Sequence, residues 1–236
     1  MKKILLEDLL GAGCHFGHQS TRLNPRAREF IFTKKEKIHI IDLAKTKEGL
    51  EKAANFVKTT AANGGEVLFV ATKRQARGIV VEAAGKRGAP YFVRRFIGGF
   101  LTNFDEVKKN LEKLNKMVVE EKKGKWKKFT KHEQAKLKRE SVKLEMLYGG
   151  VKKVEELPAA LFIIDINKEA GALHEARRKE IPVAAIVDTN TDPTLVDYPI
   201  PANDDAVGSI KYITEYIGEA YQEGKLKRKN EKVKTI

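Results

Sequence analysis

The sequence predicts an α/β domain built on a mainly parallel sheet, with a basic helical hairpin inserted into it. Continuously apolar runs such as Val67–Ala71 are typical of strands that are buried on both faces of a parallel sheet. Segments with helical spacing alternate with these runs, which is the pattern of strand–helix–strand units. Residues 103–149 interrupt the alternation with a long lysine-rich stretch that also has helical spacing.

The elements expected before the insert begin with a short amphipathic helix, in which the leucines of Leu5–Leu10 share one face. Two apolar runs, Phe30–Phe32 and Ile38–Leu43, are joined by a polar turn and predict a β-hairpin or two neighbouring strands. Helices and strands then alternate, and Gly64 and Gly85 end the two helices. These elements are expected at Thr46–Ala62, Val67–Ala71, Gln75–Ala84 and Tyr91–Val93.

The alternation of helices and strands resumes after the insert, and it continues almost to the end of the chain. Turn residues separate the elements, and Asn203 or Asp204 is expected to cap the last helix. The expected elements are a strand at Ala160–Ile164, a helix at Lys168–Lys179, strands at Val183–Val187 and Val196–Ile200, and a long helix at Asp204–Glu223.

The insert is expected to form an antiparallel helical hairpin that protrudes from the body. In each half, apolar residues step by four, three and four positions, which is the a/d spacing of a coiled coil. A capping box is expected to begin each helix, formed by Asn103 with Glu106 and by Thr130 with Glu133. The two apolar stripes are Val107, Leu111, Leu114 and Val118, and Leu137, Ser141, Leu144 and Tyr148.

Positive charge is concentrated in two segments of the chain. The whole sequence has 46 Lys and Arg against 32 Asp and Glu, a net charge of +14. Residues 107–148 hold 13 lysines and one arginine against six glutamates, and residues 224–236 hold five lysines and one arginine against Glu231. We therefore expect three parts: a discontinuous α/β domain (1–102 and 150–223), a basic hairpin (103–149) and a basic tail (224–236). The hairpin and tail are suited to contact a polyanion.

Motifs for cofactor chemistry are weak in this chain. Gly11-Ala12-Gly13 with Gly17 has glycines like those of a dinucleotide fingerprint, but a helix-like segment precedes it where that motif needs a strand. The sequence contains no Walker A pattern, and no serine or cysteine has the partners of a catalytic nucleophile. We expect no cofactor and no enzyme activity. A phosphate- or nucleotide-handling α/β enzyme is the alternative function, and an adaptor whose basic hairpin binds acidic proteins is a third.

Two groups of residues raise the question of a metal. Cys14, His15 and His18 lie within five positions, but a structural zinc site usually takes four ligands in two paired clusters. Several aspartates fall between Asp188 and Asp205, where turns and a helix cap explain them equally well. We assign no metal site, and the sequence leaves open whether either group binds one. The single cysteine and the absence of a long apolar run indicate a cytosolic protein.

Basic residues in loops and in the insert are the candidate RNA contacts. Lys73-Arg74 and Arg94-Arg95 each follow a predicted parallel strand, so both pairs are expected on one side of the sheet. Because aromatic residues are few, recognition of RNA shape and phosphate is favoured over base stacking. The candidates are Arg22, Asn24, Arg26, Arg28, Lys73, Arg74, Arg94, Arg95, Lys108, Lys109, Lys122, Lys123, Lys125, Lys127, Lys128 and Lys131.

Five motifs, in order along the chain, are similar to those of a known family. They are GAGCHFGHQSTRLNPRAREFIF (11–32), IHIIDL (38–43), FVATKR (69–74), RRFIGGFLTNF (94–104) and IVDTNTDPTLVDYPIPANDDAVGSI (186–210). Together they resemble the family of ribosomal protein number two of the bacterial small subunit. The resemblance extends from about Leu5 to Tyr221, which is essentially the whole folded part of the chain.

The resemblance implies a flavodoxin-like α/β domain with a protruding coiled-coil hairpin. It also implies a structural protein of the cytoplasmic ribosome that binds small-subunit rRNA between the head and the body. Neighbouring small-subunit proteins, including the large ribosomal protein number one, are implied as partners. Two residues depart from the family pattern: Cys14 stands where an aliphatic or small residue is usual, and Ala202 replaces a common glycine.

Overall fold

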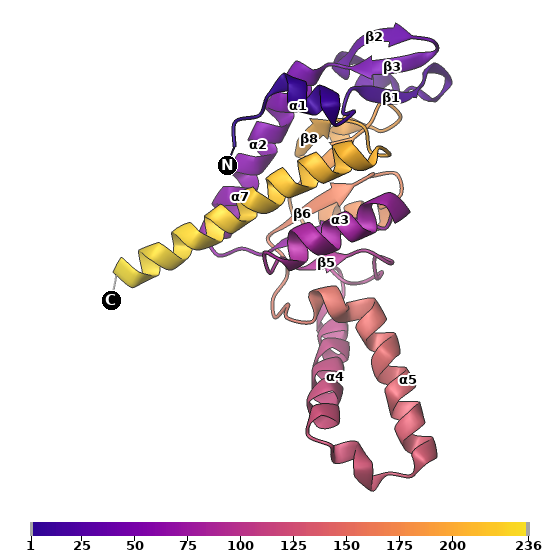
Figure 1. The fold of residues 1–236 in the computed structure, drawn as a ribbon, viewed down its shortest axis with the longest axis vertical. Helices are drawn as coiled ribbons and strands as arrows, with labels where there is room; N and C mark the ends of the chain where they lie inside the picture. Colours follow the sequence, from indigo (N-terminus) through magenta and orange to yellow (C-terminus); the bar gives the residue numbers. More distant parts are fainter. Residues whose placement is uncertain (1, 235–236) are drawn as a thin grey trace.

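The computed structural model describes residues 2–234 of the chain, with side chains described through residue 230. Its body is an α/β domain, and a pair of helices projects from one end (Figure 1). The central sheet has five strands in the order β5-β4-β6-β7-β8, and each neighbouring pair is parallel. This second-first-third-fourth-fifth order is that of the flavodoxin-like fold, so the predicted fold class is confirmed. The strands are β4 (Val67–Val70), β5 (Tyr91–Phe92), β6 (Ala160–Ile164), β7 (Val183–Val187) and β8 (Tyr198–Pro201).

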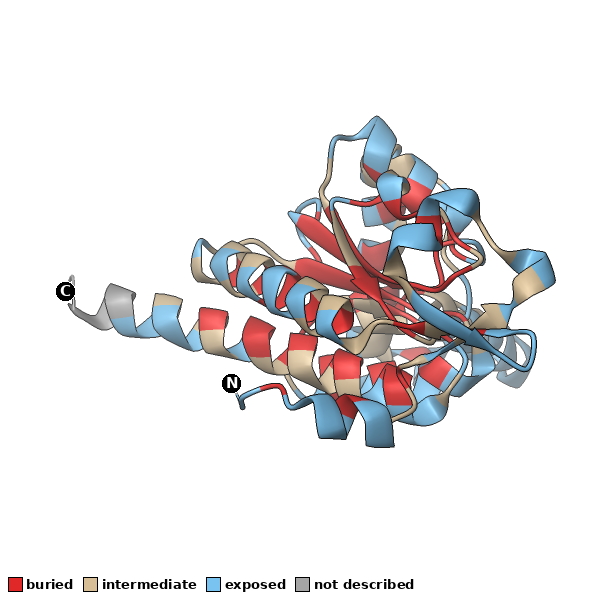
Figure 2. Cartoon of the chain, turned by 90° about the horizontal axis from the view of Figure 1, so that it is seen from above, coloured by how far each residue is buried: buried red, intermediate tan, exposed pale blue. Residues whose placement is uncertain are grey.

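Helices cover both faces of this sheet. One face packs against α2 (Leu43–Ala62), α3 (Arg74–Gly85) and α7 (Val207–Lys234), and the other packs against α6 (Ala170–Arg178) and the base of the projecting helices. Successive residues of each strand point to opposite faces, so one hydrophobic cluster contains Phe69 and the other contains Leu68. The strands are therefore buried on both sides (Figure 2), as their continuous apolar runs predict.

A smaller antiparallel sheet lies at the N-terminal end of the chain, after α1 (Leu6–Gly11). It has the order β1-β3-β2, formed by β1 (Phe16–Gln19), β2 (Ile31–Lys35) and β3 (Ile38–Ile41). The β2–β3 hairpin is the predicted one, and its two turn residues, Glu36 and Lys37, have φ of 49° and 65°, as a type I′ turn requires. Strand β1 was not predicted, because its FGHQ sequence lacks a clear apolar–polar alternation.

The insert forms the predicted helical hairpin, with α4 (Phe104–Lys122) and α5 (Lys131–Tyr148) joined by a short 3₁₀ turn at Lys125–Lys128. We call this hairpin the arm. The capping box of Thr130 and Glu133 is present, with both side chains bonded to backbone amides. The box predicted for Asn103 is wrong: this residue has φ −132° and ψ 51°, and its side chain makes no capping bond. These dihedrals lie outside the extended conformation that an N-cap adopts.

The base of the arm belongs to the hydrophobic core of the body. Val107, Leu111, Leu114 and Tyr148 are buried in the cluster that also contains Leu68 of β4. Burial of each such side chain contributes about 1.5–3 kcal/mol. Farther out, Met117 is buried and the predicted Val118 is only partly buried. Coiled-coil packing between α4 and α5 stays a prediction.

The last helix is longer than predicted, because α7 continues to Lys234 through most of the segment expected to be a tail. Residues 235–236 of that segment lie outside the described residues. Gly224 does not end the helix; a Cβ there would collide with the carbonyl oxygen of Lys58 on α2, so this glycine lets the two helices pack closely. Lys225 pairs with Glu66 at 3.0 Å and Arg228 donates to the Gly64 carbonyl oxygen at 3.3 Å. Part of the tail's charge is therefore bound to the body.

No helix in residues 2–234 combines the length and the apolar character needed to cross a membrane.

Candidate nucleic-acid interface

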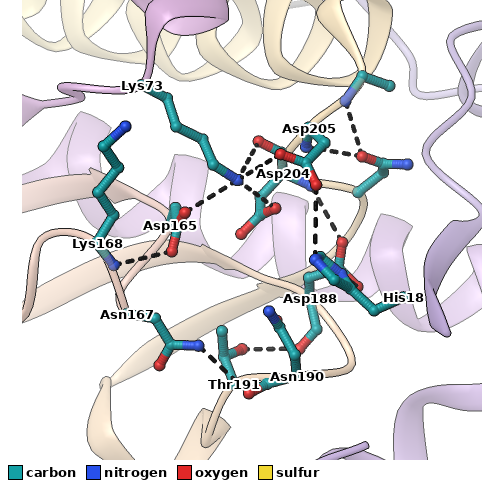
Figure 3. A network of polar contacts seen from close by, with 12 residues as sticks. His18, Lys73, Asp165, Asn167, Lys168, Asp188, Asn190, Thr191, Asp204 and Asp205 are labelled. Carbon is teal, nitrogen blue, oxygen red and sulfur yellow. Dashed lines mark hydrogen bonds and ion pairs between the residues drawn. The ribbon is translucent and has the colours of Figure 1, made fainter. Parts of the chain in front are cut away.

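Figure 3 shows a network of charged side chains at the carboxyl edge of the five-stranded sheet. Because parallel strands end at the same edge, residues that are far apart in the sequence meet there. The members are Lys73 after β4, Asp165 after β6, Asp188 after β7, Asp204 and Asp205 after β8, and His18 of β1. This edge brings together three of the aspartates that the sequence analysis singled out.

Lys73 is the centre of the network. Its Nζ lies 2.9 Å from Asp165 Oδ2, 2.7 Å from Asp204 Oδ1 and 2.8 Å from Asp205 Oδ1, and its side chain is only 12% exposed. Burial lowers the pKa of Lys73, but the carboxylate of Asp204 and the hydrogen bonds outweigh burial, so the pKa lies above its ordinary value. The contact predicted between Lys73 and an RNA phosphate stays untested, and the ammonium already has three carboxylate partners.

Asp204 is buried and is not the cap of the last helix. Its neighbour Asn203 does not cap the helix either: Asn203 Oδ1 accepts hydrogen bonds from the backbone amides of Asp205 and Ala206, both at 2.8 Å, in the turn that precedes the start of α7 at Val207. Burial, together with the nearby carboxylates of Asp188 and Asp165, raises the pKa of Asp204 to about 7. The predicted cap at Asn203 or Asp204 is therefore wrong, because Asn203 closes the turn before the helix and Asp204 is buried beside Lys73.

His18 connects β1 to this edge. Its Nδ1 lies 3.1 Å from Asp188 Oδ1, and its Nε2 lies 3.5 Å from Asp205 Oδ2. The backbone amide of His18 also donates to Thr189 Oγ1 at 2.9 Å. The hydrogen bond to Asp188 outweighs the effect of burial and raises the pKa of His18 above its ordinary value.

His18, Asp188 and Asp204 also have the chemistry of a cation site. Their ligating atoms lie within 4.8 Å of one another, and an imidazole with two carboxylates is a donor set that divalent cations accept. The other two candidates from the sequence do not contribute to it. Cys14 is buried in the core, where burial raises the pKa of its thiol, and the His15 ring packs against Phe16 with centroids 3.9 Å apart.

We expect the stability of the protein to fall as the pH rises from about 5 to 8. Both Asp204 and His18 have folded-state pKa values above their unfolded values. The stability from His18 is complete below about pH 6.5 and that from Asp204 below about pH 4, and both are lost as the pH rises through the folded pKa. For Asp204 the loss over this range is about 3 kcal/mol. Urea unfolding at four pH values measures it.

Asp204→Asn should flatten this pH profile because the variant cannot titrate at position 204. Asp192→Asn is the matched control, since hydrogen bonds from Thr194, together with the charge of Arg26, hold the pKa of Asp192 below its usual range. Identical profiles for the wild type and Asp204→Asn would contradict the role given to this carboxyl.

Arg94 and Arg95 follow β5 after one intervening residue, Val93, and are both exposed. Within the described residues neither guanidinium has an ion-pair or hydrogen-bond partner. The loop that follows them is held by Glu175 of α6. This carboxylate accepts hydrogen bonds from the amides of Gly99 (2.6 Å), Leu101 (2.9 Å) and Thr102 (3.2 Å). The two arginines are therefore exposed charges next to a firmly anchored loop.

The four RNA-contact candidates between residues 22 and 28 differ in their surroundings: two have side-chain partners within residues 2–230 and two do not. Asn24 Oδ1 accepts the Arg26 amide at 3.0 Å and begins a 3₁₀ helix, Pro25–Phe30. Arg26 Nη1 lies 2.7 Å from Asp192 Oδ2 on the surface, where such pairs contribute little to stability. Arg22 and Arg28 are exposed and, like Arg74 after β4, have no ion-pair partner among the described residues.

The predicted lysines of the arm are all exposed. All of them except Lys108 and Lys109 cluster near the tip around Trp126, which is buried and anchors the turn. Lys109, nearer the base, pairs with Glu106 at 2.5 Å. The exposed candidates are Lys108, Lys109, Lys122, Lys123, Lys125, Lys127, Lys128 and Lys131. The arm lysines and the edge arginines thus lie on separate parts of the protein.

Comparison with known proteins decides the family. The sequence pattern of ribosomal protein S2 matches residues 9–224. The chain belongs to the ribosomal protein S2 family. Curated relatives are named small ribosomal subunit protein uS2. That of Coprothermobacter proteolyticus is 47% identical over 225 residues, which cover 95% of this chain and 84% of the relative. That of Bdellovibrio bacteriovorus is 45% identical over 224 residues, which cover 95% of this chain and 72% of the relative.

Membership in the ribosomal protein S2 family confirms the resemblance found in the sequence. It gives the chain a structural role in the ribosome and makes it a non-enzymatic protein, so the nucleotide-handling enzyme is no longer the alternative. The aspartates at the sheet edge are then parts of a charge network that includes Lys73 and His18, and not catalytic groups.

Two residues that position this S2-family surface were missed from the sequence. Glu175 lies on α6 and anchors a loop 73 to 76 positions earlier in the chain. Asp165 follows β6 and has φ of 67°, an unusual conformation for a residue other than glycine. No local pattern identifies either one, because each acts on residues that only the fold brings near.

Proposed function

We propose that this chain is a structural protein of the small ribosomal subunit that binds small-subunit rRNA between the head and the body. It acts on the ribosome in the cytoplasm and supports the docking of neighbouring small-subunit proteins, including ribosomal protein number one. Two surfaces contact the RNA: the tip of the arm, and the carboxyl edge of the sheet at Arg74, Arg94 and Arg95.

The observation that carries this proposal is the arm. It projects from the body (Figure 1) and presents Lys122, Lys123, Lys125, Lys127, Lys128 and Lys131 at one exposed tip. None of these six described lysines forms an ion pair, and unpaired lysines are suited to replace the counterions of an RNA backbone. The buried Trp126 keeps the tip folded, so little ordering entropy is lost when RNA binds.

The edge arginines support the same proposal. Their guanidinium groups carry five donors in a planar fork, which matches the oxygens of a phosphate. The adjacent Gly98 is exposed and Gly99 has φ of 84°, so an RNA backbone can approach the loop closely.

Changing Arg94 and Arg95 together to alanine should weaken binding to small-subunit rRNA without changing the melting temperature. Each charge-assisted hydrogen bond to phosphate is worth about 1.5–3 kcal/mol at most. The melt should not move because both side chains are exposed and unpaired in the folded protein. Filter binding and thermal melts measure the two effects.

The matched control is the Lys52→Ala, Lys86→Ala double variant, which removes the same charge from α2 and from the end of α3. Those lysines pair with Glu48 and Glu82 one turn away, and RNA affinity should stay near the wild-type value. Equal losses in the two double variants would mean that net charge alone governs binding. Sedimentation of a cell lysate tests the proposed function itself. It would be overturned if the wild-type chain stayed in the free-protein fractions and did not sediment with small subunits.

A further inference from the structure

The outer face of α6 holds a group of basic residues outside the surfaces described above. His174, Arg177 and Arg178 are exposed and line one shallow hollow. Their spacing of three and four positions places them on one side of the helix. The opposite side, Ala172, Leu173 and Ala176, is buried in the core, so α6 cannot turn this basic face inward.

The side chains of this group have no acidic partner. Within the described residues, neither the two guanidinium groups nor the imidazole of His174 forms an ion pair or a side-chain hydrogen bond. The exposed lysines Lys52 and Lys86 of the body, in contrast, each pair with a glutamate one turn away. The negative end of the helix dipole favours Arg177 and Arg178 in the last turn.

The one acidic side chain inside this stretch faces elsewhere. Glu175 directs its carboxylate to the amides of Gly99, Leu101 and Thr102, where its charge is satisfied by hydrogen bonds. The same contact brings the loop after Arg94 and Arg95 against α6. Gly171 adds open space on this helix, since a Cβ there would meet no atom within 4 Å. The loop that follows Arg94 and Arg95 is therefore held against the same helix that carries the basic face.

We propose that the outer face of α6 binds the phosphate backbone of small-subunit rRNA through Arg177 and Arg178, with His174 lining the contact. This inference rests on the proposed function and adds a surface to it. Two guanidinium forks one position apart, without competing carboxylates, suit phosphate oxygens. An acidic protein is disfavoured as the partner because the surface is shallow and offers no apolar anchor.

The test is filter binding of the full-length chain to a small-subunit rRNA transcript between about 50 and 300 mM salt. Arg177→Gln with Arg178→Gln should weaken binding and make the slope of log affinity against log salt shallower by about 2, one for each lost phosphate contact. Arg177→Lys with Arg178→Lys keeps the charge and should restore most of the slope. Lys52→Gln with Lys86→Gln removes equal charge elsewhere and should leave the slope unchanged.

The outcomes separate this inference from the proposed function. A shallow slope of log affinity against log salt for the wild type would overturn both the α6 contact and the proposed RNA-binding function. A steep wild-type slope that the Arg177→Gln, Arg178→Gln variant retains would overturn the α6 contact alone. Unchanged RNA binding by that variant, combined with reduced sedimentation with small subunits, would assign the face to a protein neighbour and would also overturn the RNA contact.

Discussion

Replacing residues 119–138, the distal half of the arm, with a Gly/Ser linker of about ten residues should leave the body folded and sharply reduce RNA affinity. The deletion removes eight lysines against three glutamates, including all six exposed tip candidates. If those six lysines contact phosphates, the salt slope becomes shallower by about 5, and affinity near 100 mM salt falls on the order of 10³-fold. Filter binding across a salt series measures both quantities.

The cut is placed beyond the part of the arm that belongs to the core. Removing all of 103–149 would also remove Val107, Leu111, Leu114 and Tyr148 from their buried cluster, and each large-to-small loss there costs about 2–5 kcal/mol. A variant with the six tip lysines changed to glutamine is the control that keeps the hairpin. If it binds RNA as the wild type does, charge at the tip is not what holds the RNA. Loss of a cooperative melt in the short deletion would show that the distal arm also stabilises the body.

Changing Lys73 to methionine should cost about 3–5 kcal/mol of unfolding free energy, because it leaves buried carboxylates without their cation. The side chain of Asp204 is only 1% exposed. In the variant it would face Asp165 and Asp188 without the ammonium group that now lies 2.7 Å from its Oδ1. In a domain of this size, such a loss lowers the melting temperature by about 10 °C or more. Urea unfolding at neutral pH measures it.

Three comparisons test this role of Lys73. Lys168→Met is the matched control, because Lys168 lies exposed at the same sheet edge and should tolerate the change. Adding Asp204→Asn to Lys73→Met should recover part of the lost stability, since one of the uncompensated charges is gone. A lower pH should also reduce the deficit, because Asp204 becomes protonated. A stable Lys73→Met variant whose RNA salt slope is shallower would instead restore Lys73 as a phosphate contact.

The parallel body could be predicted from the sequence because its signals are local. A strand buried on both faces reads as a continuous apolar run, and β4, β6 and β7 each match their predicted runs to within one residue. The capping box at Thr130 forms from residues three positions apart, and it formed as predicted. The flavodoxin-like strand order itself came from the family resemblance, since the alternation alone indicates only a parallel sheet.

The misses come from features that local signals do not carry. Strand β1 is four residues long and contains a glycine and a histidine, so it has no periodic pattern. The last helix was expected to end at Glu223, yet it continues through Gly224, where α2 and α7 pack closely. In both places the partner in space, and not the neighbouring sequence, sets the conformation.

For the candidate site, the sequence alone determined that basic residues follow the parallel strands and cover the arm, because charge and strand position are readable in one dimension. Only the tertiary structure decided which of those charges are available. Lys73 and Arg94 both follow parallel strands, but Lys73 meets Asp204, 131 positions away, while Arg94 meets solvent. Strand order and burial determine which carboxylates reach a given lysine, and these depend on contacts between residues that are distant in the chain.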